Sequence, residues 1–107
     1  MFNLEKEHER LVVKTLENEG AWVVKFSDPK RRGGPDRLVL GDRFNPFYFI
    51  EFKRPRGIKA QLQKRYAWEL WLRGIDVYLI KSEAEAAEFL ALRKTSLVGT
   101  LASFLLK

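Results

Sequence analysis

Two charged side chains interrupt an apolar stretch in the middle of the chain. Glu51 and Lys53 lie two residues apart in the run 47–53, which is otherwise aromatic and aliphatic and is typical of a β-strand. Because side chains alternate across a strand, we expect Glu51 and Lys53 to share one face with Phe47 and Phe49. Burying such charges is costly unless they are paired or bound to a ligand. The alternative is a frayed strand end, where the two side chains reach solvent and pair with each other.

Asp36 is a second acidic residue in a suggestive position. It follows Gly33-Gly34-Pro35 and begins an expected strand, 36–40. If this strand pairs with 47–53 through the turn 41–46, Asp36 comes close to Glu51. Two adjacent carboxylates raise each other's pKa, and a divalent cation such as Mg²⁺, which takes carboxylate oxygens as ligands, relieves the repulsion. The alternative for Asp36 is a simple turn or cap residue.

Two other polar positions can contribute to the same chemistry. Glu5 and Glu9 are four residues apart and lie on a helical stripe that continues to Leu16, so these carboxylates flank the core-facing side of a first helix. The alternative is that both are solvated and stabilise the helix dipole. Gln63, near the start of a second helix, is either a surface residue or a site group.

Composition restricts the chemistry further. The chain has 107 residues, a length that predicts one domain spanning 1–107. The absence of Cys excludes disulfides and thiolate chemistry, and the single His8 excludes most His-based metal sites and triads. The apolar segment 97–106 is too short to cross a membrane, and the acidic N-terminal segment does not resemble a signal peptide. We therefore expect a cytoplasmic protein.

The net charge of +6 is concentrated in one segment. Between Lys25 and Arg65 the chain carries twelve basic and four acidic residues, a net charge of +8, whereas the remainder has eight basic and ten acidic residues and a net charge of −2. A polyanionic partner such as nucleic acid is the simplest interpretation, because each Lys or Arg that neutralises a phosphate releases counterions. The alternative is a solubilising surface.

Local patterns predict a mixed α/β fold. Asn3 and Ser82 are expected to cap helices, the second through a Ser-x-x-Glu capping box. The expected order α-β-β-β-α-β-α-α comprises helices at 3–18, 59–73, 83–92 and 97–106 and strands at 21–26, 36–40, 47–53 and 75–80. These predict a three-layer arrangement with one central mixed sheet flanked by helices. The long crossover between the third and fourth strands predicts that this pair is parallel.

With these motifs in place, the sequence resembles a known family. Gly34-Pro35-Asp36, Glu51-Phe52-Lys53 and a Gln63-headed helix that ends before Gly74 are similar to the virus-type replication-repair nuclease (VRR_NUC) domain. This domain belongs to the PD-(D/E)xK nuclease superfamily, and the resemblance covers about residues 4–80. It implies a restriction-endonuclease-like α-β-β-β-α-β core, which agrees with the elements above.

The resemblance also implies roles for individual residues. Asp36 and Glu51 correspond to ligands of Mg²⁺ or Mn²⁺, and the backbone carbonyl of Phe52 is a further possible ligand. Lys53 is expected beside the attacking water and the scissile phosphate, with Gln63 in support. A Glu on the first helix completes the family site, and spacing favours Glu5 over Glu9. From the clustering of basic residues, those expected to contact the DNA backbone are Lys30, Arg31, Arg32, Arg54, Arg56, Lys59, Lys64 and Arg65.

The implied function is metal-dependent hydrolysis of DNA, in branched substrates such as Holliday junctions or flaps. The chain is similar to the minimal stand-alone form of the domain found in phages, which implies a homodimer. Helix residues 66–72, apolar on all sides, favour the same conclusion. Two other functions remain open: a non-catalytic basic DNA-binding module, and a structural subunit in which the aromatic residues serve only the core and interfaces.

Overall fold

The computed structural model describes residues 4–52 and 58–95, with 4–6, 58–59 and 95 described by their backbone alone. Its helices are α1 (Leu4–Asn18), α2 (Ile58–Leu72) and α3 (Glu83–Leu92), followed by a short 3₁₀ turn, η1 (Arg93–Thr95). Its strands are β1 (Trp22–Lys25), β2 (Arg37–Leu40), β3 (Phe47–Glu51) and β4 (Asp76–Leu79). The expected element order is confirmed for these residues, while the expected helix 97–106 lies outside them.

The four strands form one mixed sheet in the order β1-β2-β3-β4. β1 and β3 are both antiparallel to β2, and β4 is parallel to β3, as the crossover through α2 predicts. The β2–β3 turn is closed by a 2.9 Å hydrogen bond from the Gly41 N–H to the Pro46 carbonyl. Arg37 is paired with Ile50 in this hairpin, so the start of β2 lies next to the end of β3.

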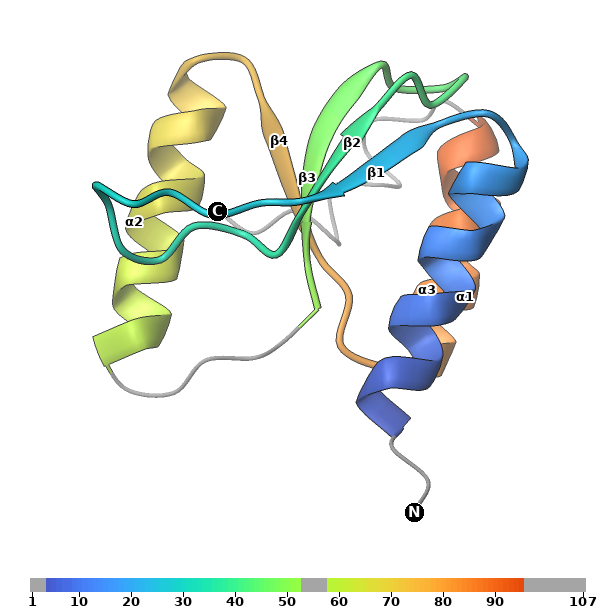
Figure 1. Cartoon of the computed structure of the whole chain (residues 1–107), viewed down its shortest axis with the longest axis horizontal. Coiled ribbons are helices and arrows are strands. Elements are labelled where there is room, and N and C mark those ends of the chain that lie inside the picture. Colours follow the sequence, from blue (N-terminus) through green and yellow to red (C-terminus); the bar gives the residue numbers. More distant parts are fainter. Residues whose placement is uncertain (1–3, 53–57, 96–107) are drawn as a thin grey trace.

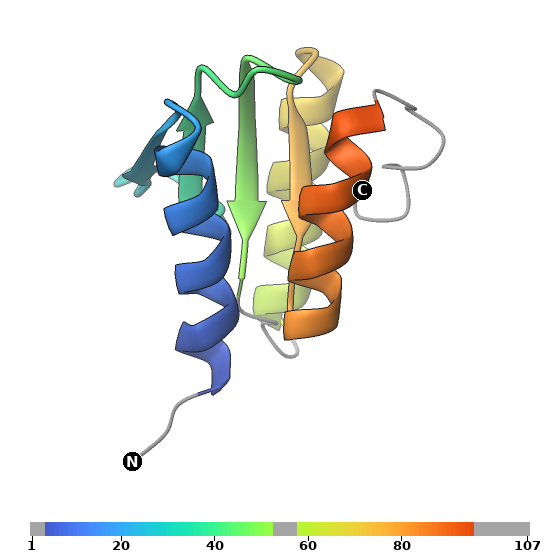
Figure 2. The ribbon, with the colours of Figure 1, turned by 90° about the vertical axis from the view of Figure 1, so that its right-hand side faces the viewer.

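The sheet lies between two helical layers. α1 and α3 run side by side over one face, and α2 covers the other (Figures 1 and 2). Successive β3 side chains point to opposite faces of the sheet and pack in the hydrophobic core on each side. Tyr48 and Ile50 pack with the α1–α3 layer, and Phe49 packs with Ala67 of α2. Ser82 caps α3 as predicted, because its hydroxyl accepts a 3.1 Å hydrogen bond from the Glu85 N–H. No helix within 4–52 and 58–95 is long and apolar enough to cross a membrane.

The loop between β1 and β2 packs tightly against α2 at one glycine. Gly33 has a φ of +86°, which favours glycine. A Cβ atom built there would lie 2.5 Å from the backbone carbonyl carbon and oxygen of Leu62 and 2.8 Å from the Gln63 nitrogen. The absence of a side chain at Gly33 therefore lets this loop approach the start of α2.

We expect Gly33→Ala to lower the free energy of unfolding by more than the backbone strain of a positive φ alone would. Gly20→Ala is a matched control, because Gly20 has a φ of +97° but no atom within 4 Å of the position of an added Cβ. The control should cost about 1–2 kcal/mol of unfolding free energy from backbone strain. Urea denaturation of both variants checks this, and equal losses would show that the loop does not need its close contact with α2.

Candidate active site

Asp36 links the start of β2 to the end of β3. Its backbone N–H donates a 3.1 Å hydrogen bond to the Ile50 carbonyl, and its Oδ2 accepts a 2.8 Å hydrogen bond from the Phe52 N–H. Glu51 is the residue between these two partners, and only 4% of its surface is exposed. The hairpin register thus brings the two acidic residues together, although 14 residues separate them in the sequence.

Glu51 is a buried charge at the end of an otherwise apolar strand. Its backbone carbonyl accepts a 2.9 Å hydrogen bond from the Ile80 N–H, which ties it into the parallel pairing with β4. Alternation places Glu51 on the same face as Phe49, toward α2, whereas Phe52 packs in the core beneath α1 and α3. A carboxylic side chain buried at the end of a strand, next to a second acidic residue, is a candidate for function.

Gln63 lies beneath the loop that leads to Asp36. It is 6% exposed, and its backbone nitrogen lies at the close contact with Gly33, three residues before Asp36. The structure therefore brings Gln63 to the loop of the candidate site from a distant part of the chain. It is a buried polar residue rather than a surface residue.

A network around Asp28 holds the basic loop in place. Asp28 Oδ1 accepts hydrogen bonds from the Lys30 and Arg31 N–H groups at 2.9 and 3.2 Å, and Oδ2 accepts one from the Tyr66 hydroxyl at 2.8 Å. The Lys30 N–H, followed by the Tyr66 hydroxyl, lowers the pKa of the Asp28 carboxyl. Burial, reinforced by the bond to Asp28, raises the pKa of Tyr66. The loop that carries Lys30, Arg31 and Arg32 is thereby anchored to α2.

Tyr66→Phe is expected to raise the pKa of Asp28 toward its ordinary value, because one of the donors that stabilise the carboxylate is lost. A lowered folded-state pKa stabilises the fold above the unfolded-state value, near pH 4, and this effect is lost as the pH falls through the folded value. The stability gap between wild type and variant should therefore be full at neutral pH and shrink in acid. NMR titration of the carboxyl carbon and denaturation at several pH values check this, and an unchanged Asp28 pKa would contradict it.

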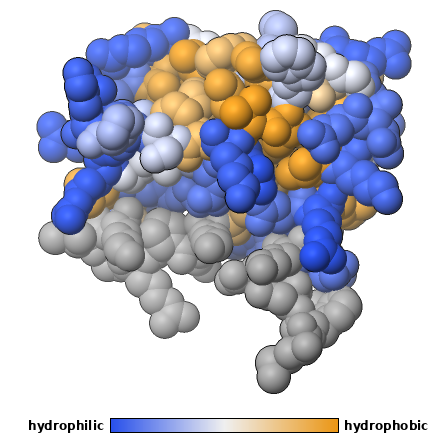
Figure 3. Space-filling model, viewed as in Figure 1, coloured by the Kyte–Doolittle hydropathy of each residue, from blue (hydrophilic) through white to orange (hydrophobic). Residues whose placement is uncertain are grey.

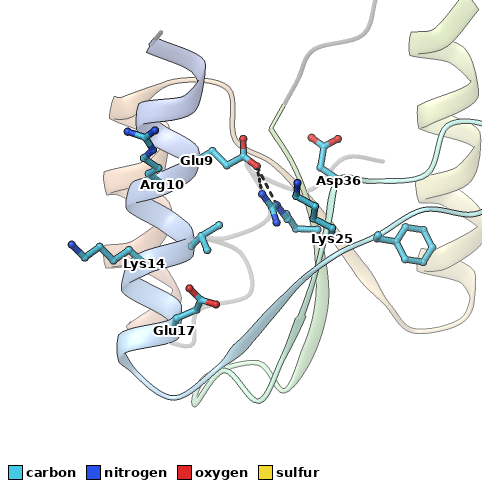
Figure 4. A pocket seen from close by; sticks show the side chains of 9 residues that line it. Glu9, Arg10, Lys14, Glu17, Lys25 and Asp36 are labelled. Carbon is cyan, nitrogen blue, oxygen red and sulfur yellow. Dashed lines mark hydrogen bonds and ion pairs between the residues drawn. The ribbon is translucent and has the colours of Figure 1, made fainter. Parts of the chain in front are cut away.

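The candidate site opens beside a pocket between α1 and the sheet, with a volume of about 600 Å³. Figure 4 shows Glu9 entering this pocket from α1 and Asp36 from the opposite side, with Lys25 between them in this view. Glu9 Oε1 accepts two hydrogen bonds from the Arg37 guanidinium, at 3.1 and 2.7 Å. The structure thus places Glu9, one of the two first-helix candidates, at the pocket next to Asp36.

Several pocket residues were not among the predicted site residues. Arg37 follows Asp36 directly and orients Glu9, and Lys25 is paired with Arg37 across β1 and β2. Lys14 and Arg10 line the pocket from α1. From the sequence, Lys25 could be placed at the pocket only by predicting the register of β1 on β2. The position of the α1 residues depends on how that helix packs on the sheet, which the sequence does not show.

Other predicted residues differ in how far the structure describes them. Lys53, Arg54 and Arg56 lie outside the described residues, and the side chains of Glu5 and Lys59 are also outside them. Lys30, Arg31, Arg32 and Lys64 are exposed to solvent, as residues that contact a DNA backbone must be. Their role in binding stays a prediction.

The donor chemistry of the site suits a hard divalent cation. Asp36 and Glu51 supply two carboxylates, and Mg²⁺ commonly takes one or two carboxylates together with waters and substrate phosphate. Within the described part of the chain, no cluster of three or more His, Cys, Asp or Glu side chains is positioned to hold a metal. A cation here would therefore depend on the Asp36–Glu51 pair, with backbone oxygens, water or substrate completing its shell.

Comparisons with known proteins bear on the architecture. No family model matches the sequence, and no curated protein matches it. A solved structure described as a VRR_NUC domain superposes with a TM-score of 0.69 and 22% sequence identity, covering 84% of this chain and 97% of that one. The order of elements, the mixed sheet and its helical layers thus have a known counterpart. The chain therefore has the fold of a VRR_NUC domain, a restriction-endonuclease-like α/β architecture.

Proposed function

We propose that this protein is a metal-dependent DNA endonuclease that hydrolyses phosphodiester bonds in branched DNA, such as Holliday junctions or flaps. The observation that carries the proposal is that Asp36 hydrogen-bonds to both neighbours of the buried Glu51, so that two acidic residues lie side by side at one end of the sheet. The VRR_NUC fold and the basic central segment support it.

Asp36 and Glu51, with the Phe52 carbonyl, would hold Mg²⁺ or Mn²⁺. Such an ion, when bound, stabilises charge that develops on the phosphate and lowers the pKa of a coordinated water. Lys53 orients or deprotonates the attacking water or neutralises the phosphate, while Gln63 and a first-helix Glu support the site. In the reaction a water oxygen bonds to phosphorus, one P–O ester bond breaks, and the departing oxygen takes up a proton.

The basic side chains would hold the substrate backbone around this centre. Lys30, Arg31 and Arg32 lie on the loop anchored by Asp28, and Lys64 lies on α2. We also propose that Arg54 and Arg56 contribute from the connection between β3 and α2, and Lys59 from the start of α2. Contacts of this kind set position and affinity rather than sequence preference, which favours structure-specific or nonspecific cutting over site-specific cutting.

The test is cleavage of linear, flapped and four-way-junction DNA by the purified protein with Mg²⁺, with Mn²⁺ and with EDTA. Cleavage that requires metal and prefers branched substrates supports the proposal. Equal DNA binding with and without EDTA and no cleavage under any condition would favour the non-catalytic DNA-binding module instead.

We further propose that two copies of the chain associate. Trp22 on β1 and Phe47 on β3 are the neighbours of Leu40 on either side of β2. All three are on the sheet face toward α2, and Trp22 and Phe47 are exposed. On α2, Trp68 and Trp71 stack on each other with their ring centroids 5.0 Å apart and are also exposed. Figure 3 shows an apolar area in the upper middle of the face seen in Figure 1. Such a surface is unusual for a small monomer, and a second copy related by two-fold symmetry would cover it.

The expected mass in solution is twice the chain mass of 12.6 kDa. We expect Trp22→Ser, which alters the most exposed of these aromatic side chains, to shift the protein toward the monomer. Leu11→Ser is the control, because Leu11 is an exposed apolar residue of α1 on the opposite face. Sedimentation velocity at several concentrations measures the effect. A wild-type protein that is monomeric at all concentrations would contradict the proposed dimer.

A further inference from the structure

A second hollow of about 630 Å³ lies between the basic loop and α2, apart from the pocket that contains Asp36. Its charged and polar lining comprises Arg31, Arg32, Arg65, Tyr66, Glu69 and Arg73. Four of these six are arginines and one is acidic. We refer to this hollow as the arginine groove. The excess of positive charge in its lining suits a polyanionic ligand.

The helix side of the arginine groove is a regular stripe. Arg65, Glu69 and Arg73 follow at intervals of four residues along α2 and its last turn, a span of roughly 12 Å. Arg73 donates hydrogen bonds to the Glu69 carboxylate at 3.1 Å and to the Glu69 carbonyl at 2.8 Å, so this acid is already neutralised. In the ranges that the structure covers, no carboxylate forms an ion pair with Arg65 or Arg32.

The loop side of the arginine groove is held in place before any ligand binds. Tyr66, which lines the groove, donates its hydroxyl to Asp28, and Asp28 in turn accepts the N–H of Arg31. Gly33 then packs against the backbone of Leu62 and Gln63. Arginines on a pre-ordered surface lose less freedom on binding, and their planar guanidinium groups match phosphate oxygens in pairs.

The position of the arginine groove relates it to the candidate active site. One end lies at Leu62, next to Gln63 and the loop that continues to Asp36, and the other lies at Arg73, beyond the end of α2. A roughly 12 Å stripe matches about three base pairs of a duplex, which carries one phosphate charge per roughly 1.7 Å of its axis. The groove therefore runs from the site along α2 on a path that a DNA backbone can follow.

We propose that the arginine groove binds the sugar–phosphate backbone of a duplex DNA arm as it leaves the active site, with Arg65 and Arg73 as phosphate contacts. This rests on the proposed nuclease function for the direction of the arm, but the binding itself needs no metal and no cleavage. The groove adds Arg73, just beyond the end of α2, to the DNA-contacting residues expected from the sequence, and it places Arg65 beside the basic loop.

The test is the affinity of the full-length protein for a fluorescent duplex in EDTA over a series of salt concentrations. Arg65→Ala combined with Arg73→Ala should weaken binding about tenfold or more and reduce the slope of log affinity against log salt by about 2. Arg43→Ala combined with Lys94→Ala removes the same charge from exposed positions outside the groove and should leave the slope nearly unchanged. Thermal denaturation confirms that both variants fold.

The outcomes separate this inference from the proposed function. An unchanged salt slope in the groove variant, or an equal change in the control, overturns the arginine groove even if the wild type cuts DNA with metal. A reduced slope in the groove variant alone supports the groove, even if the wild type cuts no DNA and the nuclease proposal fails.

Discussion

Replacing Glu51 with Gln or Asp36 with Asn is expected to lower metal-dependent DNA cleavage about 100-fold or more. Each change removes one of the two negative charges available to a cation and keeps the side-chain shape. Losing a single group that stabilises transition-state charge typically costs a factor of about 10²–10³. Initial rates on a branched substrate at saturating Mg²⁺ measure the effect.

Both variants should still fold and bind DNA in EDTA. In Asp36→Asn, the new side-chain amide oxygen can still accept the 2.8 Å hydrogen bond from the Phe52 N–H, so the link between β2 and β3 is retained. Glu17→Gln is the matched control, because Glu17 lines the same pocket from the far end of α1. Cleavage by Glu51→Gln at the wild-type rate would show that the carboxylates do not form the active site.

Arg93→Met is expected to cause the largest loss of stability. Arg93 is 3% exposed and donates to Asp42 Oδ1 at 2.8 Å and to Glu19 Oε1 at 2.7 Å. Asp42 is also buried and accepts a 2.6 Å hydrogen bond from the Tyr48 hydroxyl. Burial, reinforced by this bond, raises the pKa of Tyr48, so its hydroxyl stays protonated and donates. This network joins the end of α1, the β2–β3 turn and η1.

Removing one partner of a buried ion pair leaves the other charge uncompensated, which costs about 3–5 kcal/mol. This is a large part of the roughly 5–15 kcal/mol that stabilises a typical domain. Arg73→Met is the control, because its ion pair with Glu69 is exposed and worth less than about 1 kcal/mol. Urea denaturation followed by circular dichroism measures both, and similar midpoints would contradict a structural role for the network.

Local patterns in the sequence were sufficient for the elements and for one key contact. The turn at 41–46 is so short that antiparallel pairing is the simplest arrangement of the two strands that it connects. This pairing brings Asp36 next to Glu51. The Ser82 cap and the parallel β3–β4 pair likewise follow from short-range signals and a single crossover. The hairpin and the cap depend on residues near one another in the chain, and the parallel pair depends on one crossover helix.

Packing between distant elements decided the rest. Whether Glu9 reaches the pocket depends on how α1 docks on the sheet, which brings it to Arg37, 28 residues away. The Arg93 network joins residues 51 and 74 positions apart, and the arginine groove requires the loop after β1 to lie along α2. No periodicity or capping signal encodes such contacts, because they arise only when the helical layers close on the sheet. The sequence alone determined the order of elements and the acidic pair, and the tertiary structure decided which charged side chains surround that pair.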